Sequence, residues 1–161
     1  MQRATVSLSN MFTGIVQKTA TVASAKKLGS SQQMEVALPT GWKLANGASV
    51  AVDGVCVTVT GTKRGAFSFE CMPVTLKKTT ARTWEKGRVV NLERALRQKD
   101  LLDGHLIQGH VEGRARIISI KEEGRSKSLT LALPKTLAKN IALHGSVAVN
   151  GVSLTVSRTR D

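Results

Sequence analysis

The sequence predicts an all-β chain made of two similar six-stranded antiparallel barrels in tandem, the second of them incomplete. The first observation is a near-repeat, because GASVAVDGVCVTV at 47–59 returns as GSVAVNGVSLTV at 145–156. A repeat of this size indicates two copies of one module. The second observation is a succession of short runs rich in Val, Ile and Thr, separated by Gly and polar turns, which is typical of strands. Short, mostly antiparallel strands close into small barrels that leave few free sheet edges.

The strands of the first copy follow from its runs of β-branched residues. A hairpin is predicted where strands 49–52 and 55–60 flank Asp53-Gly54, since both turn positions tolerate positive φ. A strand at 34–38 ends at Pro39, and a short turn or helix over 40–44 follows. Further strands are expected at 66–72 and 88–92, and residues 95–102 are expected to form a helical or loop-like link to the second copy.

The second copy repeats this order. Strands 146–149 and 152–156 flank Asn150-Gly151, and a strand at 129–133 ends at Pro134, before a turn or helix over 136–142. We therefore divide the chain into an extension at 1–10, a first barrel at 11–97 and an incomplete second barrel at 98–161. Asp161 aligns with Arg64, so we expect either that another chain completes this barrel or that the sequence is partial. Residues 1–10 are similar to a fragment of a transit peptide, and equally to a misassigned start or an expression scar.

The composition limits the partners of this chain. Its 161 residues carry a formal net charge of +13, which admits a nucleic-acid or anionic-surface partner and equally a barrel exterior solvated by lysines. The basic residues are spread along the chain without an alternating basic and aromatic pattern, which argues against nucleic-acid binding. No apolar run approaches the ~20 residues of a membrane helix. Two cysteines are too few for a disulfide framework and favour a reducing, intracellular setting.

Five motifs in a fixed order carry a family resemblance. They are MFTGIV at 11–16, DGVCVTV at 53–59, NLERA at 91–95, GHLIQGHV at 104–111 and NGVSLTV at 150–156. Together they resemble riboflavin synthase of the α-chain type, a family that also includes the lumazine-binding antenna proteins of luminous bacteria. The resemblance covers residues 11–161.

This resemblance implies a fold, a reaction and an assembly. Family members have two six-stranded Greek-key barrels and a C-terminal helix that holds a homotrimer, with each active site between the first barrel of one subunit and the second barrel of its neighbour. Two molecules of 6,7-dimethyl-8-ribityllumazine bind there. One transfers a four-carbon unit to the other, which yields riboflavin and 5-amino-6-ribitylamino-pyrimidinedione without a cofactor or a metal. The implied location is the cytoplasm, or an organelle if residues 1–10 are a transit-peptide remnant. The alternative is a non-catalytic lumazine- or flavin-binding protein, or an inactive fragment of the synthase.

Four residues are candidates for catalysis under this resemblance, namely Cys56, Ser49, His110 and Ser153. Cys56 is a candidate nucleophile or proton carrier, since a thiolate is reactive where its pKa is lowered. Its plainer interpretation is a small buried residue on a Val-rich strand. The two serines would activate or hydrogen-bond the substrate, or be ordinary strand serines. An imidazole at His110 can shuttle protons near neutral pH, but this residue and His105 could also be structural, and a zinc site would need two more ligands.

A larger set of positions is expected to contact the two substrates. The segments 14–16 and 109–111 would supply backbone groups to the ligand rings, and the stretch 70–75 matches the part of the family that binds the first ligand. Val74 stands where an acidic residue is usual, and His144 stands where a lysine is common. The turns Asp53-Gly54 and Asn150-Gly151 are assigned to turn geometry only. The expected substrate contacts are Gly14, Ile15, Val16, Val57, Thr58, Glu70, Met72, Thr75, His105, Gly109, Val111, His144, Leu154 and Thr155.

Overall fold

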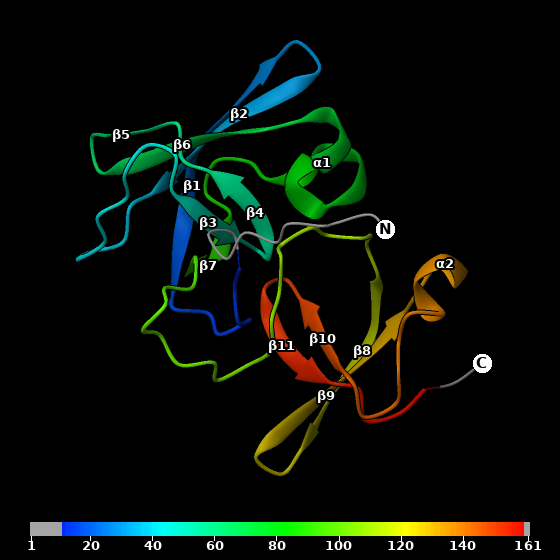
Figure 1. The fold of residues 1–161 in the computed structure, drawn as a ribbon. Helices are drawn as coiled ribbons and strands as arrows, with labels where there is room; N and C mark the ends of the chain where they lie inside the picture. The colour runs from blue at the N-terminus through cyan, green and yellow to red at the C-terminus, as the bar shows by residue number, and fades with distance from the viewer. Residues whose placement is uncertain (1–10, 160–161) are drawn as a thin grey trace, which may run out of the picture.

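The first copy forms a seven-stranded antiparallel sheet that wraps around one core (Figure 1). The computed structural model describes residues 11–159. The strands of this sheet are β1 (Lys18–Leu28), β2 (Ser31–Ala37), β3 (Ser49–Val52), β4 (Val55–Thr58), β5 (Gly61–Lys63), β6 (Ala66–Cys71) and β7 (Val89–Arg94). They are arranged in the order β4-β3-β7-β1-β2-β6-β5. The all-β prediction is confirmed, with the three-residue β5 as an addition to six longer strands.

The long strand β1 allows the sheet to wrap, because it belongs to two parts of it. Residues 18–21 pair with β7, and residues 22–28 pair with β2. A register shift between Val22 and Ser24 lies at the start of the part paired with β2, and such a bulge bends a strand and increases its twist. On the far side, the Thr60 amide donates to the Ser68 carbonyl at 2.8 Å, which links the residues after β4 to β6.

Alternation along the strands builds the core of the first copy. In β2, Met34 and Val36 are fully buried, whereas Glu35 between them is exposed. The predicted hairpin β3–β4 is confirmed and contributes the valines at 50, 52, 55 and 57 to the same core. Each buried aliphatic or aromatic side chain stabilises the fold by roughly 1.5–3 kcal/mol. The largest fully buried side chains are Trp84, Phe12, Phe67, Phe69, Met34 and Leu92.

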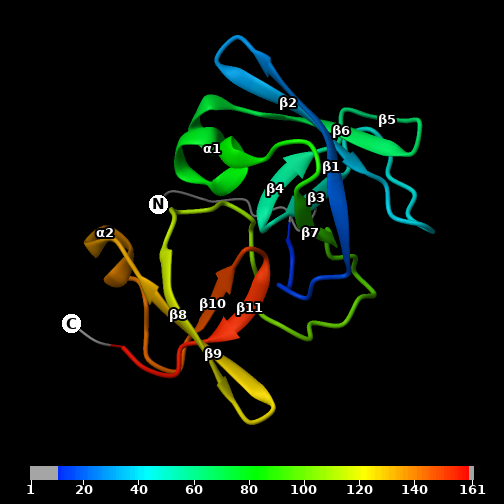
Figure 2. The same ribbon diagram turned by 180° about the vertical axis from the view of Figure 1, so that it is seen from behind.

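The described part of the second copy consists of two hairpins and a short helix (Figure 2). These elements are β8 (Arg116–Glu123), β9 (Ser126–Ala132), α2 (Lys135–Ala138), β10 (Ser146–Val149) and β11 (Val152–Thr155). The four strands correspond to β1–β4 of the first copy. The bulge of β1 also recurs in β8, between Ile117 and Ser119.

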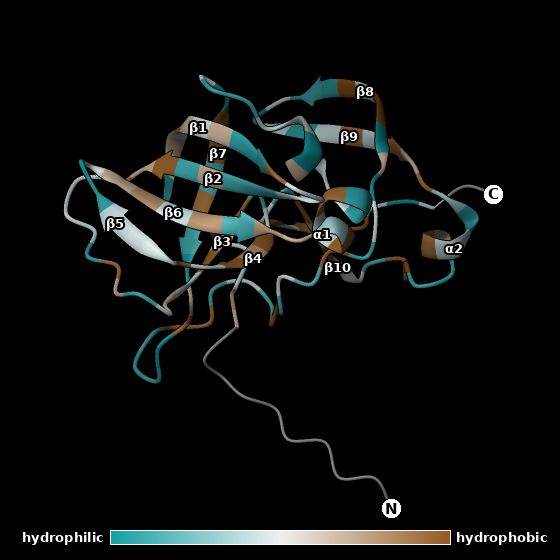
Figure 3. Cartoon of the chain, turned by 90° about the horizontal axis from the view of Figure 1, so that it is seen from above, coloured by the Kyte–Doolittle hydropathy of each residue, from teal (hydrophilic) through white to brown (hydrophobic). Residues whose placement is uncertain are grey.

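The two copies differ in how far their apolar faces are covered. Val22 of the first copy is fully buried, whereas its counterpart Ile117 is 53% exposed. Met34 is likewise fully buried, whereas its counterpart Leu129 is 39% exposed. Hydrophobic residues are visible along β8 in Figure 3. Within residues 11–159, the second copy has no counterpart of β5–β7, which agrees with the predicted incomplete barrel.

The helical elements are short. The helix α1 (Pro73–Lys78) and the 3-10 helix η2 (Thr80–Thr83) join β6 to β7 and were not predicted from the sequence. Pro73 suits the first helical turn, where an amide donor is not needed. Residues 95–102 form a loop rather than a helix. Among residues 11–159, no helix combines the length and apolar character needed to cross a membrane.

Candidate functional site

The opening segments of the two copies, residues 11–16 and 106–111, pair with each other. The Phe12 amide donates to the Ile107 carbonyl at 2.7 Å, and the Ile107 amide donates back to Phe12 at 2.9 Å. These residues occupy equivalent positions in the repeat, 95 residues apart. An antiparallel pair of equivalent residues indicates a local two-fold relation between the copies, and this pair lies at its centre.

Each opening segment then reaches the hairpin of the other copy. The Gly14 carbonyl accepts a hydrogen bond from the Ser153 amide at 2.8 Å, and the Gly109 carbonyl accepts one from the Cys56 amide at 2.9 Å. Both glycines have positive φ, at 77° and 72°. A Cβ at Gly14 would lie 2.8 Å from the Ser153 nitrogen, and one at Gly109 would lie 2.7 Å from the Cys56 Cβ. The crossing therefore requires glycine at both positions, for conformation and for space.

The two hairpin turns also meet each other. A Cβ at Gly54 would lie 2.6 Å from the Gly151 nitrogen, and one at Gly151 would lie 2.8 Å from the Gly54 nitrogen. The Asn91 side-chain amide donates to the Asn150 carbonyl at 3.0 Å and joins β7 to this contact. From the sequence these residues were expected to serve turn geometry only, whereas in the structure the two turns also form a close contact between the copies.

Asp53 anchors the first of these turns from inside the fold. Its carboxylate accepts a hydrogen bond from the Asn91 amide at 2.8 Å, and its own amide donates to the Asn91 carbonyl at 2.9 Å. The Arg88 guanidinium lies 3.9 Å from the carboxylate. Burial raises the pKa of Asp53, against the opposing effects of the Asn91 hydrogen bond and the Arg88 charge.

Cys56 and Ser49 lie together on the paired strands β3 and β4. Cys56 is half-buried, and burial raises the pKa of its thiol, while a hydrogen bond with the Ser49 side chain lowers it in part. The thiol is therefore protonated at neutral pH. This state suits a proton donor, and a nucleophilic role would first require removal of the proton.

In the second copy, Ser153 has a different partner. The His105 Nδ1 lies 2.7 Å from the Ser153 hydroxyl, and the His105 amide donates to the Thr13 carbonyl at 3.1 Å. The imidazole and the hydroxyl can exchange a proton at this distance. His110 is exposed and follows Gly109 directly, so it lies one residue from the backbone partner of Cys56.

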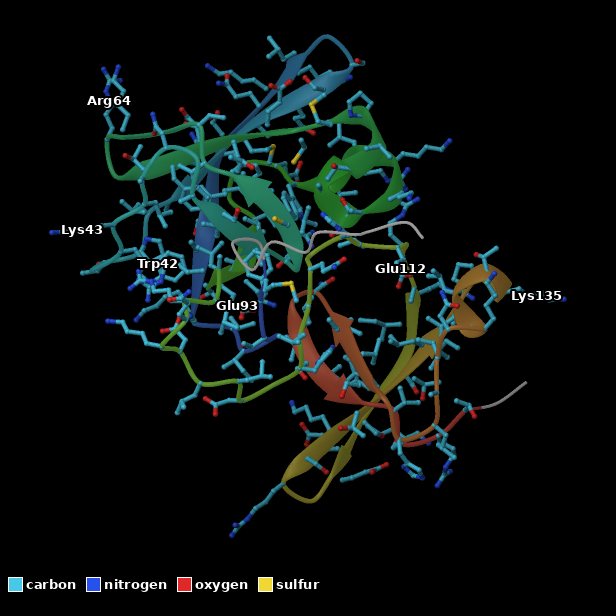
Figure 4. The ribbon with its side chains drawn as sticks, viewed as in Figure 1. Trp42, Lys43, Arg64, Glu93, Glu112 and Lys135 are labelled. Carbon is cyan, nitrogen blue, oxygen red and sulfur yellow. The ribbon has the colours of Figure 1, made fainter. Side chains whose placement is uncertain are left out.

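Glu93 is a structural residue of this region that sequence reasoning missed. Its carboxylate is buried at the end of β7 and accepts hydrogen bonds from the Thr13 amide at 2.6 Å, the Thr13 hydroxyl at 2.8 Å and the Gly14 amide at 3.0 Å (Figure 4). It therefore fixes the segment that pairs with Ser153. The available signal for Glu93 was an acidic residue inside an apolar strand, but the motif NLERA was used only as evidence for the family resemblance.

The stretch 70–75 leads from β6 into α1. The Ser31 hydroxyl donates to the Glu70 carboxylate, and the Thr75 carbonyl accepts hydrogen bonds from the amide and hydroxyl of Thr79 at 3.0 and 2.8 Å. Met72 is 55% exposed at the start of the helix, and Val74 is 58% exposed. The exposed pair is thus accessible to a ligand, whereas the Glu70 carboxylate, which is also exposed, already accepts a hydrogen bond from Ser31.

The other predicted contacts are distributed over both copies. Val57 is buried in the first core, so it is already covered by protein, and Val111 of the second copy is partly buried where it packs against that core. Ile15 is 45% exposed in a groove of about 410 Å³ that is also lined by Thr13 and Glu93. The remaining predicted positions are partly buried or exposed, namely Val16, Thr58, Leu154, Thr155 and His144.

Two further observations define the chemistry available. His144 has a φ of 64° at the turn before β10, and its amide donates to the Val156 carbonyl at 2.8 Å. Within residues 11–159, no three His, Cys, Asp or Glu side chains are grouped so that they could hold a metal ion.

Comparison with known proteins connects this geometry to a family. The lumazine binding domain matches residues 13–95 and 108–161. Riboflavin synthase of Bacillus subtilis (strain 168) is 38% identical over 147 residues, which cover 91% of this chain and 68% of that protein. Riboflavin synthase of Brucella abortus (strain 2308) is 42% identical over 155 residues, covering 91% of this chain and 76% of that protein.

Solved structures agree with this match. LumP complexed with 6,7-dimethyl-8-(1'-D-ribityl) lumazine has a TM-score of 0.82 at 25% identity, covering 93% of this chain and 82% of that one. LumP complexed with riboflavin has a TM-score of 0.81 at 27% identity, with coverages of 89% and 79%. LumP complexed with flavin mononucleotide has a TM-score of 0.80 at 27% identity, with coverages of 93% and 81%.

Proposed function

The chain belongs to the lumazine-binding domain family of riboflavin synthases, and from this premise we propose that it acts as a riboflavin synthase. The reaction is the dismutation of two molecules of 6,7-dimethyl-8-ribityllumazine. One molecule transfers four carbons to the other, giving riboflavin and 5-amino-6-ribitylamino-pyrimidinedione. The observation that carries the proposal is the crossing of the two copies, which fixes Cys56 and Ser153 at equivalent points of two related hairpins.

The two hairpins offer different chemistry on the same frame. The first presents a protonated thiol beside the Ser49 hydroxyl, and the second presents a hydroxyl beside the His105 imidazole. The C7 methyl group of one lumazine must lose a proton, and the partner lumazine must accept an addition at C7. The His105 imidazole is the proposed base because its ring can accept a proton through the Ser153 hydroxyl, and the Cys56 thiol is the proposed proton donor or, once deprotonated, the nucleophile.

Assembly completes the proposal. Cys56 and Ser153 are equivalent under the local two-fold relation, so each belongs to a pocket of its own copy. Following the family resemblance, we place the reaction between the first copy of one subunit and the second copy of a neighbour in a homotrimer. Holding two flat substrates in register there contributes through proximity. The free thiols of Cys56 and Cys71 fit a reducing compartment, and we propose the cytoplasm.

A direct assay tests the enzymatic proposal. The protein is incubated with 6,7-dimethyl-8-ribityllumazine, and riboflavin fluorescence is followed over time. Cys56→Ser is expected to reduce turnover at least tenfold, whereas Cys71→Ala, which alters the other cysteine at a core position, is expected to retain it in the folded fraction. Absence of turnover in the unaltered chain would refute the enzymatic proposal for this protein.

A second candidate function is non-catalytic binding of a lumazine or flavin. The related LumP structures contain 6,7-dimethyl-8-(1'-D-ribityl) lumazine, riboflavin and flavin mononucleotide, and the apolar face of the second copy is only partly covered. Tight binding of one riboflavin per chain without product formation would select this alternative. The presence of Cys56, Ser49 and His110 together favours the enzyme, because binding alone does not require all three.

A further inference from the structure

A basic groove of about 550 Å³ lies between the first copy and the beginning of β8. One side is formed by the end of α1 and by η2, and the other by residues 113–116, which lie beside α1 in Figures 1 and 2. Five of the lining side chains are cationic, and none of the lining residues is acidic. The cations are Lys77, Lys78 and Arg82 on the first side and Arg114 and Arg116 on the second.

These five charges are not neutralised by ion pairs. Within residues 11–159, the ion pairs are Arg88 with Asp53 and Lys127 with Glu122, and neither involves the groove. All five cationic residues are exposed. Like charges from the two copies therefore face one another across the groove, in a chain whose net charge is already +13. An anion bound between them would offset this repulsion.

The lining offers donors that suit phosphate oxygens. Arginine guanidinium groups bind phosphate oxygens through two parallel hydrogen bonds, and lysine ammonium groups add charge. Thr80 also lines the groove and offers a hydroxyl donor. No aromatic residue lines it, so nucleic-acid bases would have no stacking surface.

We propose that this groove binds the phosphate group of a small organic phosphate. The position of α1 suggests how such a ligand would be arranged, because Met72 and Thr75, two predicted substrate contacts, lie at the start of the helix whose end lines the groove. A phosphorylated flavin could place its ring system at Met72 and Thr75 and its phosphate in the groove. The inference does not rest on synthase activity, because the charges of the groove are independent of Cys56 and Ser153.

Calorimetric titration with inorganic pyrophosphate at low ionic strength tests the site. The double variant R82Q/R114Q removes one charge from each side of the groove, and neither side chain is part of a described hydrogen bond or ion pair. The matched control K26Q/K27Q removes two exposed charges from β1. We expect pyrophosphate to bind at least tenfold more weakly to R82Q/R114Q and within twofold of the unaltered chain to K26Q/K27Q. Absence of binding, an equal loss in both variants, or tighter binding of a single-stranded oligonucleotide with the same variant dependence would overturn the proposal.

A comparison of flavin mononucleotide with riboflavin identifies the source of the phosphate. If the phosphate belongs to the flavin, the nucleotide binds more tightly than riboflavin, and R82Q/R114Q removes the difference. If the site takes a free organic phosphate, the two flavins bind alike while pyrophosphate still requires the two arginines. Riboflavin binding is measured separately, so its loss would contradict the proposed function and leave the result for pyrophosphate intact.

Discussion

Glu93→Gln is expected to destabilise the chain by loosening the opening segment of the first copy. The carboxylate accepts three hydrogen bonds, two from Thr13 and one from the Gly14 amide, at 2.6–3.0 Å. A glutamine of the same size keeps one acceptor oxygen and turns a donor toward the remaining N–H group. A hydrogen bond to a charged group contributes roughly 1.5–3 kcal/mol, and an unpaired buried donor costs about 1–3 kcal/mol. We therefore expect the free energy of unfolding to fall by about 2–4 kcal/mol.

Thermal unfolding followed by circular dichroism measures this effect. For a chain of this size, each kcal/mol lowers the melting temperature by about 2–4 °C, so the shift should be on the order of 5–15 °C. Glu35→Gln is the matched control, since Glu35 is an exposed residue of β2, and it should remain within about 0.5 kcal/mol of the unaltered chain. If Glu93→Gln and Glu35→Gln had the same melting temperature, the assignment of Glu93 as an anchor of the opening segment would be refuted.

Three further experiments test the crossing and the buried ionisable groups. Gly109→Ala should lower the free energy of unfolding by about 2–4 kcal/mol, because the residue has positive φ and its new Cβ would overlap with Cys56. The control Gly124→Ala has a similar φ but open space around it, and it should lower the free energy of unfolding by only about 1 kcal/mol. Equal losses for the two variants in chemical denaturation would contradict the overlap with Cys56. Burial raises the pKa of the Cys56 thiol, and it raises the pKa of Cys71 to about 12. Iodoacetamide should therefore label Cys56 mainly above pH 9.0 and leave Cys71 unlabelled in the folded chain. Rapid labelling at pH 7, measured by mass spectrometry, would contradict this prediction. Burial raises the pKa of Asp53 above 3.8, so the stabilisation from its proton is complete below pH 3.8 and is lost as the pH rises through the raised pKa. The stability of Asp53→Asn relative to the unaltered chain should therefore increase across that window, and a constant difference in urea unfolding would contradict the shift.

Local signals made the hairpins predictable. Asp53-Gly54 and Asn150-Gly151 both adopt positive φ in two-residue turns, as the residue types required. The strand ends before Pro39 and Pro134 were also found, because proline restricts the residue before it. The helix α1 was missed since it is only six residues long and has no buried residue, so no apolar periodicity marks it.

The candidate site was only partly predictable. Gly14 and Gly109 were expected to contact substrate by resemblance, which stays a prediction, and the structure gives a separate reason for glycine there, the lack of room for a Cβ against the other copy. Glu93 could not be assigned a role, because its partners Thr13 and Gly14 are about 80 residues away in sequence. The pairing of His105 with Ser153 has the same origin, since only the crossing of the opening segments brings them together.

The crossing changes how the repeat should be understood. If each copy were an independent pocket, the backbone of Cys56 would be positioned by the first copy alone. Instead its amide donates to Gly109 of the second copy, just as the Ser153 amide donates to Gly14 of the first. The close contact of Gly54 with Gly151 fixes the same relation at the turns. A perturbation of either opening segment therefore reaches the hairpin of the other copy, and the two hairpins are coupled through backbone geometry within a single chain.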